Sequence, residues 1–261
     1  MEALTQQFPG LQLPRTILTD ELWSKLKPIL LEHDIHDKPT LRRTVEGILY
    51  RLRVGCPWRD LPAAFGPWNT VYKRYNHWSS KSIFIHVLNV LSKDTDTEWV
   101  FMDGSYIKAH QHGTGAAGQG DQAIGLSRGG NTSKIHLAVD AYGLPLRFEI
   151  TGGHVNDCTA APVLIESLPE SDRVVADKGY DSKAIRTQIE ATGAMPVIPR
   201  RKNSRLGNQD LDRDLYKLRH LVENMFARLK HFRAVATRYD KLKRNFVSMV
   251  ALACCIVWLP M

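Results

Sequence analysis

From residue 97 onward, the chain alternates between short segments with the two-residue period of β-strands and longer segments with the period of helices. The segments that favour strands are 99–102, 134–139, 146–151, 173–176 and 195–199. Helices are favoured over 160–167, 182–191 and 212–235. Three strands, a helix, a strand, a helix, a strand and a long helix predict an α/β domain built on a mixed sheet. The Tyr-Gly-Leu-Pro sequence at 142–145 is typical of a turn between the second and third strands.

Residues 1–95 have a different pattern and favour helices separated by prolines. Thr19 is a suitable cap for a first helix, a second is favoured over 40–53, and Asn69 is a suitable cap for a third that runs to Ser79. We therefore predict two domains, a helical one over 1–95 and an α/β one over 96–261.

The third predicted helix has an apolar face and a basic face. Val71, Tyr75 and Trp78 recur at helical spacing, which leaves Lys73, Arg74 and His77 to face outward. This pattern fits a helix-turn-helix-like module whose third helix binds DNA. The alternative is a plain helical bundle with an exposed basic face, and this stretch alone does not decide between them.

The long helix predicted over 212–235 carries a polar stripe. Tyr216, Arg219, Glu223 and Lys230 follow the spacing Y-x2-R-x3-E-x6-K, which brings all four within roughly one sixth of the helix circumference at 100° per residue. The apolar residues of the same segment lie on a different face. One face is therefore expected to pack on the domain and the neighbouring face to carry Glu223.

Two further acidic residues follow predicted strands. Asp103 comes after strand 99–102 in Asp-Gly-Ser, and Asp177 comes after strand 173–176 in Ala-Asp-Lys-Gly-Tyr-Asp. Taken singly, Asp103 fits a turn, Asp177 a cap, and Glu223 an ion pair with Arg219 or Lys230. The other acids near strand ends or turns are Asp140, Asp157 and Asp181.

These motifs together resemble the bacterial insertion-sequence transposases of the DDE class. The stretch 127–136, Ser-Arg-Gly-Gly followed by Lys-Ile-His, and the Cys-Pro-Trp-Arg-Asp-Leu-Pro stretch at 56–62 are also similar to that family. The resemblance extends from about residue 18 to residue 259. It implies an RNase H-like mixed-sheet catalytic domain preceded by a small helical, helix-turn-helix-like DNA-binding domain.

The resemblance also implies a chemistry and a set of ligands. Asp103, Asp177 and Glu223 would be the catalytic acids and would bind two Mg²⁺ ions, roughly 4 Å apart, that activate the nucleophile and stabilise the leaving oxygen. Mn²⁺ would be able to substitute. Carboxylate oxygens are the ligands that such hard cations prefer. Phosphates of DNA would contact a set of mostly basic residues, which is Tyr216, Arg219, Lys230, Lys73, Arg74, Arg238 and Lys241.

The charge distribution agrees with a polyanionic substrate. Residues 200–244 carry 14 Lys and Arg against 5 Asp and Glu, a balance of 14 − 5 = +9, whereas the whole chain carries +8. A basic segment around the long helix favours nucleic acid as partner. The alternative, a solvated charged helix face, stays open at this stage.

Other sequence features argue against several classes of protein. The four cysteines form no C-x-x-C pair, which argues against a zinc site or a disulfide framework. The Gly-rich stretch 113–131 predicts a flexible loop. The chain shows no signal-peptide pattern, and its longest apolar stretch, 247–259, is too short to span a bilayer and predicts a buried terminal helix. We therefore expect a cytoplasmic protein.

The predicted function is cleavage of DNA at the terminal inverted repeats of an insertion sequence and joining of the 3′ ends to target DNA. Assembly on two element ends implies a homodimer or a larger oligomer. Two alternatives remain: a metal-dependent nuclease without strand transfer, and a non-catalytic DNA-binding protein descended from such an enzyme. The three acids argue against the second, because carboxylates beside phosphates bring no benefit to a protein that only binds.

Overall fold

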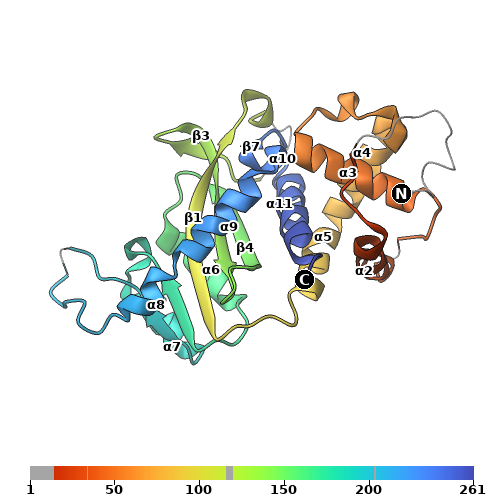
Figure 1. Ribbon diagram of the computed structural model, residues 1–261. Helices are drawn as coiled ribbons and strands as arrows, with labels where there is room; N and C mark the ends of the chain where they lie inside the picture. The colour runs from red at the N-terminus through yellow and green to blue at the C-terminus, as the bar shows by residue number, and fades with distance from the viewer. Residues whose placement is uncertain (1–14, 34, 116–119, 203) are drawn as a thin grey trace. The chain divides into compact units, whose positions relative to one another are not determined.

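The computed structural model describes residues 15–33, 35–115, 120–202 and 204–261, which form two compact units (Figure 1). The helical unit holds the described residues up to Leu91, with His231–Ala236 and Arg244–Met261; the α/β unit holds Ser92–Lys230 and Thr237–Lys243. The first boundary lies close to the predicted one at residue 95. The N-terminal residues from which we inferred that there is no signal peptide lie outside the described part.

The helical unit contains the predicted N-terminal helices. Its first elements are α2 (Asp20–Leu31), α3 (Leu41–Val54), η1 (Trp58–Asp60), η2 (Ala63–Phe65), α4 (Trp68–Ser80) and α5 (Ile83–Leu91). Thr19 caps α2 as predicted, because its side chain accepts a hydrogen bond from the Leu22 amide. The predicted cap Asn69 is wrong: α4 already begins at Trp68 after Pro67, so Asn69 lies inside the helix. The predicted core face of α4 is confirmed, since Val71, Tyr75 and Trp78 are buried.

The C-terminal helix completes the helical unit. It is α11 (Lys243–Trp258), preceded by the short α10 (Arg233–Ala236). The Tyr75 hydroxyl donates to the Asn245 carbonyl, and Cys255 Sγ lies 3.7 Å from the Phe84 carbonyl oxygen. The contacts thus group this segment with the N-terminal helices, whereas we predicted it as part of the domain over 96–261. A helix that is apolar on nearly all sides has to be enclosed by other helices, and α4 and α5 provide that enclosure.

The α/β unit is built on a seven-stranded sheet. Its strands are β1 (Trp99–Ala109), β2 (Gly125–Ser127), β3 (Gly130–Val139), β4 (Pro145–Gly152), β5 (Arg173–Ala176), β6 (Met195–Val197) and β7 (Thr237–Arg238). The order β4-β3-β1-β5-β6 has antiparallel pairs on one side of β1 and parallel pairs on the other. This is the predicted RNase H-like arrangement, with β2 added to β3 and β7 to β1.

Helices cover both faces of this sheet (Figure 1). The helices of the unit are η3 (Gln111–Gly113), α6 (Asp157–Glu166), η4 (Lys178–Tyr180), α7 (Lys183–Ala191), α8 (Arg213–Lys217) and α9 (His220–Lys230). On one face α6 and α7 enclose the main core with Met102, Ala176 and Tyr180. On the other face α9 lies across β1 and β3 and buries Val222 and Met225.

Three predicted elements differ from the structure. β1 continues to Ala109, because β3 pairs with it as far as Lys108, so the predicted strand end at Asp103 is wrong. The Gly-rich stretch predicted to be a loop contains β2, which pairs with the start of β3; residues 116–119 of it lie outside the described part. The predicted helix over 212–235 is divided into α8, α9 and α10.

No helix in the described ranges is long and apolar enough to cross a membrane.

Candidate functional site

Two of the three predicted acids lie beside each other at the end of β5. The parallel pairing of β1 with β5 ends at Met102 and Ala176, and Asp103 and Asp177 are the next residues of the two segments. Neighbouring strands run about 4.8 Å apart. Because side chains alternate along a strand and Met102 points into the core of α6 and α7, Asp103 points to the opposite face, which α9 covers. The end of β5, and not that of β1, therefore defines the site.

Asp103 is an unfavourable place for a negative charge. Its side chain is only 22% exposed. Burial raises the pKa of Asp103 and the Asp177 charge raises it further, while hydrogen bonds from the Gly104 amide and Arg219 lower it. The hydrogen bonds and the Arg219 charge thus do not fully offset the cost of burying the Asp103 carboxylate. A bound cation would reduce this cost.

Asp177 is held by the turn that follows β5. Its Oδ1 accepts a hydrogen bond of 2.6 Å from the Gly179 amide at the start of η4. The capping role considered from sequence is therefore present, and it fixes the orientation of the carboxylate beside Asp103. Tyr180, at the end of the same turn, is fully buried. Burial raises the pKa of Tyr180, and the nearby carboxylates of Asp157, Asp103 and Asp177 raise it further.

Arg219 connects the third acid to the first. Its Nη1 donates to Asp103 Oδ2 at 2.7 Å, and its Nη2 donates to a carboxylate oxygen of Glu223. Burial alone would lower the pKa of Arg219, but the Asp103 and Glu223 carboxylates raise it. Among the residues described, no three of His, Cys, Asp and Glu stand close enough together to hold a metal ion. The guanidinium therefore occupies the position between Asp103 and Glu223 at which positive charge is required.

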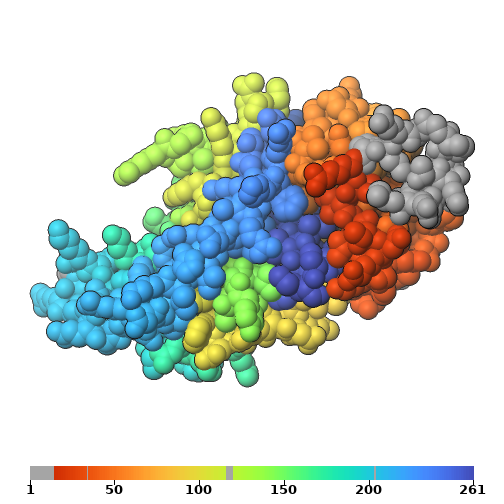
Figure 2. Space-filling view, viewed as in Figure 1, coloured from red at the N-terminus to blue at the C-terminus, as the bar shows by residue number. Residues whose placement is uncertain are grey.

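The residues of the predicted polar stripe remain close together although the helix is divided into α8 and α9. Tight i→i+3 backbone bonds at Leu218, Arg219 and Leu221 join α8 to α9. Residues three apart nearly eclipse in such a turn, so the Arg219 guanidinium lies 6.0 Å from the Tyr216 ring centroid. Lys230 is exposed, and its Nζ donates to Ser105 Oγ at 2.7 Å, two residues beyond Asp103. The segment of α8 and α9 forms a continuous light-blue surface in Figure 2.

The other residues predicted to contact DNA differ from one another in exposure. Lys73 is exposed on α4 in the helical unit, and Lys241 is exposed in the α/β unit. Arg74 is half-buried, and its Nη1 donates to Thr44 Oγ1 at 2.5 Å. The prediction for Arg238 is wrong, because its side chain is fully buried and donates to protein oxygens.

The acids that were alternative candidates have structural roles. Asp140 is fully buried and accepts hydrogen bonds from Thr95 and from the amides of the β3–β4 turn. Asp181 forms an ion pair of 2.9 Å with Arg186 and accepts a hydrogen bond from the Arg201 amide.

Asp157 forms a buried ionic cluster that sequence reasoning missed. Its carboxylate lies 2.7 Å from Lys134 Nζ, 3.3 Å from His136 Nδ1 and 3.5 Å from the Tyr180 hydroxyl. The cluster lies behind Gly104, where an added Cβ would approach Asp157 Oδ1 to 2.6 Å. Gly104 is therefore needed in the middle of β1 because Asp157 closes in on the strand. Lys134 and His136 alternate along β3 and so share one face, but no local pattern in the sequence pairs them with Asp157.

We expect Lys134→Met to destabilise the fold, because it leaves the largely buried Asp157 carboxylate without its ion-pair partner. The loss is about 3 kcal/mol, as for other broken buried pairs. Desolvation raises the pKa of Asp157, but hydrogen bonds and charges of His136 and Lys134 together lower it. Because the folded state then binds fewer protons than the unfolded state, this stability is present above about pH 4 and is lost as the pH falls through the lowered pKa. Urea unfolding at several pH values measures both effects.

The exposed Lys183→Met is the control and should leave the unfolding free energy unchanged. The double variant Lys134→Met with Asp157→Asn should recover part of the loss, since neither charge is then left alone. Equal stability of wild type and Lys134→Met would contradict the assignment of the cluster.

The acids have the donor chemistry of a divalent-cation site. All three offer hard carboxylate oxygens, which Mg²⁺ and Mn²⁺ prefer to sulfur or nitrogen. Burial is the main cause of the raised pKa of Asp103, and Asp177 places a second carboxylate beside it. The residues therefore fit a divalent cation. An RNase H-like sheet with carboxylates at this strand end defines the class of metal-dependent enzymes that act on phosphodiesters.

Comparison with protein families identifies the chain more closely. The model of the "Transposase DDE domain" matches residues 94–258, and the model of the "Putative transposase of IS4/5 family" matches residues 18–88. The first match alone covers more than half of the chain. The chain therefore belongs to the family of transposases with a DDE domain, and it is a DNA transposase of the insertion-sequence type. Enzymes with this domain depend on divalent metal ions.

Curated relatives carry names of the same kind. The chain is 39% identical over 132 residues to the "Putative transposase for insertion sequence element IS6501" of Brucella ovis, covering 49% of this chain and 98% of the relative. It is 34% identical to the "Putative transposase for insertion sequence element IS402" of Burkholderia cepacia, covering 48% of this chain and 62% of the relative. A match to the "Transposase for insertion sequence element IS1106" of Neisseria meningitidis serogroup B is 29% identical and spans 45% of that protein.

Solved structures show only distant likeness. The piggyBac transposase in a synaptic complex with hairpin DNA matches 72% of this chain and 50% of its own, with 12% identity and a TM-score of 0.42. The catalytic domain of the Mos1 mariner transposase matches 86% of this chain and 95% of its own, with 11% identity and a TM-score of 0.28. Scores this low carry no argument, so the fold assignment rests on the strand order described above.

Proposed function

We propose that this transposase binds the terminal inverted repeats of an insertion sequence, cleaves the DNA at the element ends and joins the 3′ ends to target DNA. The observation that carries the proposal is the pairing of Asp103 with Asp177 at the end of β5, together with the link from Asp103 through Arg219 to Glu223. A substrate of double-stranded DNA accounts for the +9 charge balance of residues 200–244, the segment that carries Glu223.

Asp103, Asp177 and Glu223 are the proposed ligands of Mg²⁺, with Mn²⁺ able to substitute. When bound, such ions activate an oxygen nucleophile and stabilise charge on the leaving oxygen. The chain itself orients the acids: β1 carries Asp103, the cap of η4 fixes Asp177, and α9 carries Glu223. The Glu223 side chain is 52% exposed and is held by Arg219, which also binds Asp103.

Tyr216, Arg219 and Lys230 are the proposed contacts to DNA beside the acids. Arg219 offers a planar fork and Lys230 a point charge, and both suit phosphate oxygens. Lys241 would extend this path, and Lys73 and Arg74 would contact DNA from the helical unit. Contacts of this kind provide affinity and register but no sequence information, so base recognition would come from elsewhere, most simply from the helical unit.

We further propose that the enzyme acts as a homodimer or a larger oligomer, because two element ends have to be processed together. Since the substrate is the DNA of the cell, we place this activity in the cytoplasm.

Glu223→Gln tests the proposal, because the amide keeps the shape of the side chain but removes its charge. We expect cleavage of duplex DNA carrying the element ends to fall by roughly 10²-fold, with joining lost in parallel and end binding retained. The measurement is Mg²⁺-dependent cutting of labelled ends and joining to a target plasmid.

Glu190→Gln, an exposed acid on α7, is the matched control and should behave as wild type. If Glu223→Gln cuts and joins as wild type does, Glu223 is only a surface acid. If wild type cuts without joining, the protein is a nuclease without strand transfer and the proposed function is wrong.

A further inference from the structure

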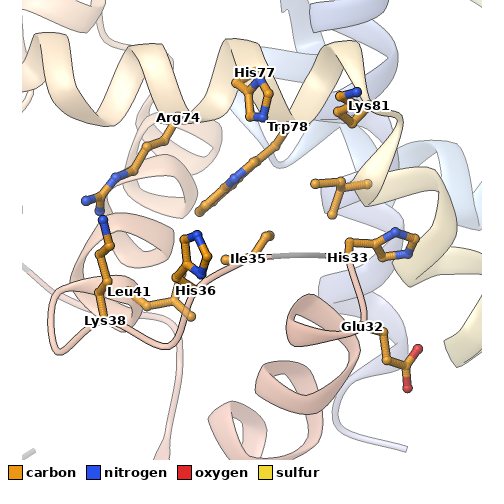
Figure 3. A pocket seen from close by; sticks show the side chains of 11 residues that line it. Glu32, His33, Ile35, His36, Lys38, Leu41, Arg74, His77, Trp78 and Lys81 are labelled. Atoms are coloured by element: carbon orange, nitrogen blue, oxygen red, sulfur yellow. The ribbon is translucent and has the colours of Figure 1, made fainter.

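A hollow of about 650 Å³ lies within the helical unit, between the end of α2, the segment that follows it and the second half of α4 (Figure 3). Its walls are mostly basic and aromatic. The lining residues are Glu32, His33, Ile35, His36, Lys38, Leu41, Arg74, His77, Trp78, Lys81 and Ile83. We call this hollow the α2–α4 pocket. Asp34, which follows His33 in the sequence, lies outside the described residues.

Positive charge in the α2–α4 pocket exceeds the negative charge of its described lining. Lys38, Arg74 and Lys81 are cations at neutral pH, and the lining also holds three histidines. Glu32 is the one acid in that described lining. Its carboxylate is 60% exposed and lies 3.7 Å from His86 Nε2, so it is directed to α5. The nearby Asp37 is paired with Lys27 at 2.8 Å.

Arg74 is fixed in place by neutral acceptors. Its Nη1 donates to Thr44 Oγ1 at 2.5 Å and to Thr40 Oγ1 at 3.4 Å. Figure 3 shows Lys38 and Arg74 extending toward each other from the α2–α3 segment and from α4. Within the described part of the chain, neither they nor Lys81 take part in an ion pair. Two like charges directed at each other repel, and an anion between them would turn this repulsion into attraction.

One imidazole of the pocket is also left without a partner. His33 Nε2 is buried and, within the described part, makes no hydrogen bond, although its ring packs against His86 with centroids 3.9 Å apart. A buried polar nitrogen without a partner is unfavourable unless a ligand or water satisfies it. The lining also includes the side chains of Leu41, Trp78 and Ile83. Apolar surface beside the cations lowers the local dielectric constant and strengthens their attraction to an anion.

We propose that the α2–α4 pocket binds phosphate groups of the DNA backbone, with Lys38, Arg74 and Lys81 as the contacting cations. This inference rests on the proposed function, which makes DNA the polyanion that the enzyme has to hold. It moves the DNA contact of the helical unit from the outward face of α4, which carries Lys73, to the hollow on its other side. Arg74 and His77 are the residues of the predicted basic face that line this hollow.

The test is equilibrium binding of labelled duplex DNA carrying the element ends by the full-length protein, at several salt concentrations. Lys38→Ala with Lys81→Ala should weaken binding roughly tenfold near physiological salt and lower the slope of log Kd against log salt by about 2, close to 0.9 for each phosphate that is no longer neutralised. Both lysines are exposed, so the fold should be retained, which circular dichroism and thermal melting check.

The control is Lys93→Ala with Lys183→Ala, which removes the same charge from exposed positions outside the pocket and should leave the slope unchanged. Lys38→Arg with Lys81→Arg should retain the wild-type slope, because charge and not shape carries the contact. A double alanine variant with the wild-type slope overturns the inference. If its slope is unchanged but inorganic phosphate still shifts the NMR signals of the pocket histidines in wild type, the pocket is a small-anion site and the DNA assignment is wrong.

These outcomes are distinguishable from failure of the proposed function. If wild type and the double alanine variant bind and cleave end DNA equally well, only the inference about the pocket is wrong. If wild type does not bind end DNA, both the pocket inference and the proposed function are wrong.

Discussion

Asp103→Asn is expected to reduce cleavage at the element ends by roughly 10³-fold, the largest effect of any single substitution in this chain. Asparagine has nearly the same shape and keeps one oxygen, which can accept from the Gly104 amide as Oδ1 does, while its amide nitrogen replaces the Oδ2 that accepts from Arg219. It removes the negative charge that lies beside Asp177. The reduction should therefore appear in the chemical step, whereas the dissociation constant for end DNA should stay close to that of wild type.

The same variant should not unfold. Burial and the Asp177 charge raise the pKa of Asp103, so the ionised carboxylate is unfavourable in the folded state near neutral pH. Its removal should leave the melting temperature without metal within about 3 °C of wild type. Addition of Mg²⁺ or Mn²⁺ should raise the melting temperature of wild type, by mass action on the folded state, and raise that of Asp103→Asn much less.

Asp172→Asn is the matched control, because Asp172 is an exposed acid that precedes β5 while Asp177 follows it. It should cleave as wild type does. If Asp103→Asn retains wild-type cleavage, or if metal stabilises both proteins equally, Asp103 is not a metal ligand and the proposed site is wrong.

Arg238→Met is expected to give the largest loss of stability, about 5 kcal/mol, through several broken hydrogen bonds to a charged group. The fully buried guanidinium donates to the carbonyls of Ala123, Asp240 and Lys241 and to Ser133 Oγ. It thereby connects the strand β7 to the segment before β2 and to β3. Burial lowers the pKa of Arg238 to about 10, so the side chain stays charged at neutral pH. Urea unfolding of the purified protein measures the loss.

A neighbouring lysine separates this structural role from DNA binding. Lys241 is exposed, so Lys241→Met should unfold as wild type does but bind DNA more weakly, with a salt slope lower by about 1. Arg238→Met, where it remains folded, should keep the wild-type slope. A stable Arg238→Met protein with a reduced salt slope would contradict the structural role and favour a DNA contact at Arg238 instead.

The local patterns of the sequence predicted most of the fold. Periods of two and 3.6 residues identified β3, β4 and β5, the helices α6 and α7, and the buried face of α4, because these periods depend on residues only a few positions apart. The same local reasoning failed where contacts with a segment far along the chain determine the extent of an element. β1 is longer than its apolar run, since β3 pairs with its polar half as well. The predicted cap Asn69 failed because the helix already begins at Trp68, directly after Pro67.

Some features of the candidate site can likewise be predicted from the sequence, and others cannot. The order of Asp103, Asp177 and Glu223 and the stripe of Tyr216, Arg219 and Lys230 are readable in the sequence. The bridge from Arg219 to Asp103, 116 positions away, is not. Nor is the pairing of Lys134 with Asp157, because a lysine in a strand is usually exposed and only the approach of α6 encloses this one.

By itself the sequence determined the class of fold, the order of the acids and the basic character of the segment around them. Each of these follows from residue type and local spacing. The tertiary structure decided which charges are available to a substrate. It buried Arg238, turned Arg74 toward the α2–α4 pocket, bound Arg219 between two carboxylates and placed α11 in the helical unit. The physical reason is that burial and ion pairing depend on contacts between segments far apart in the chain, which no local period encodes.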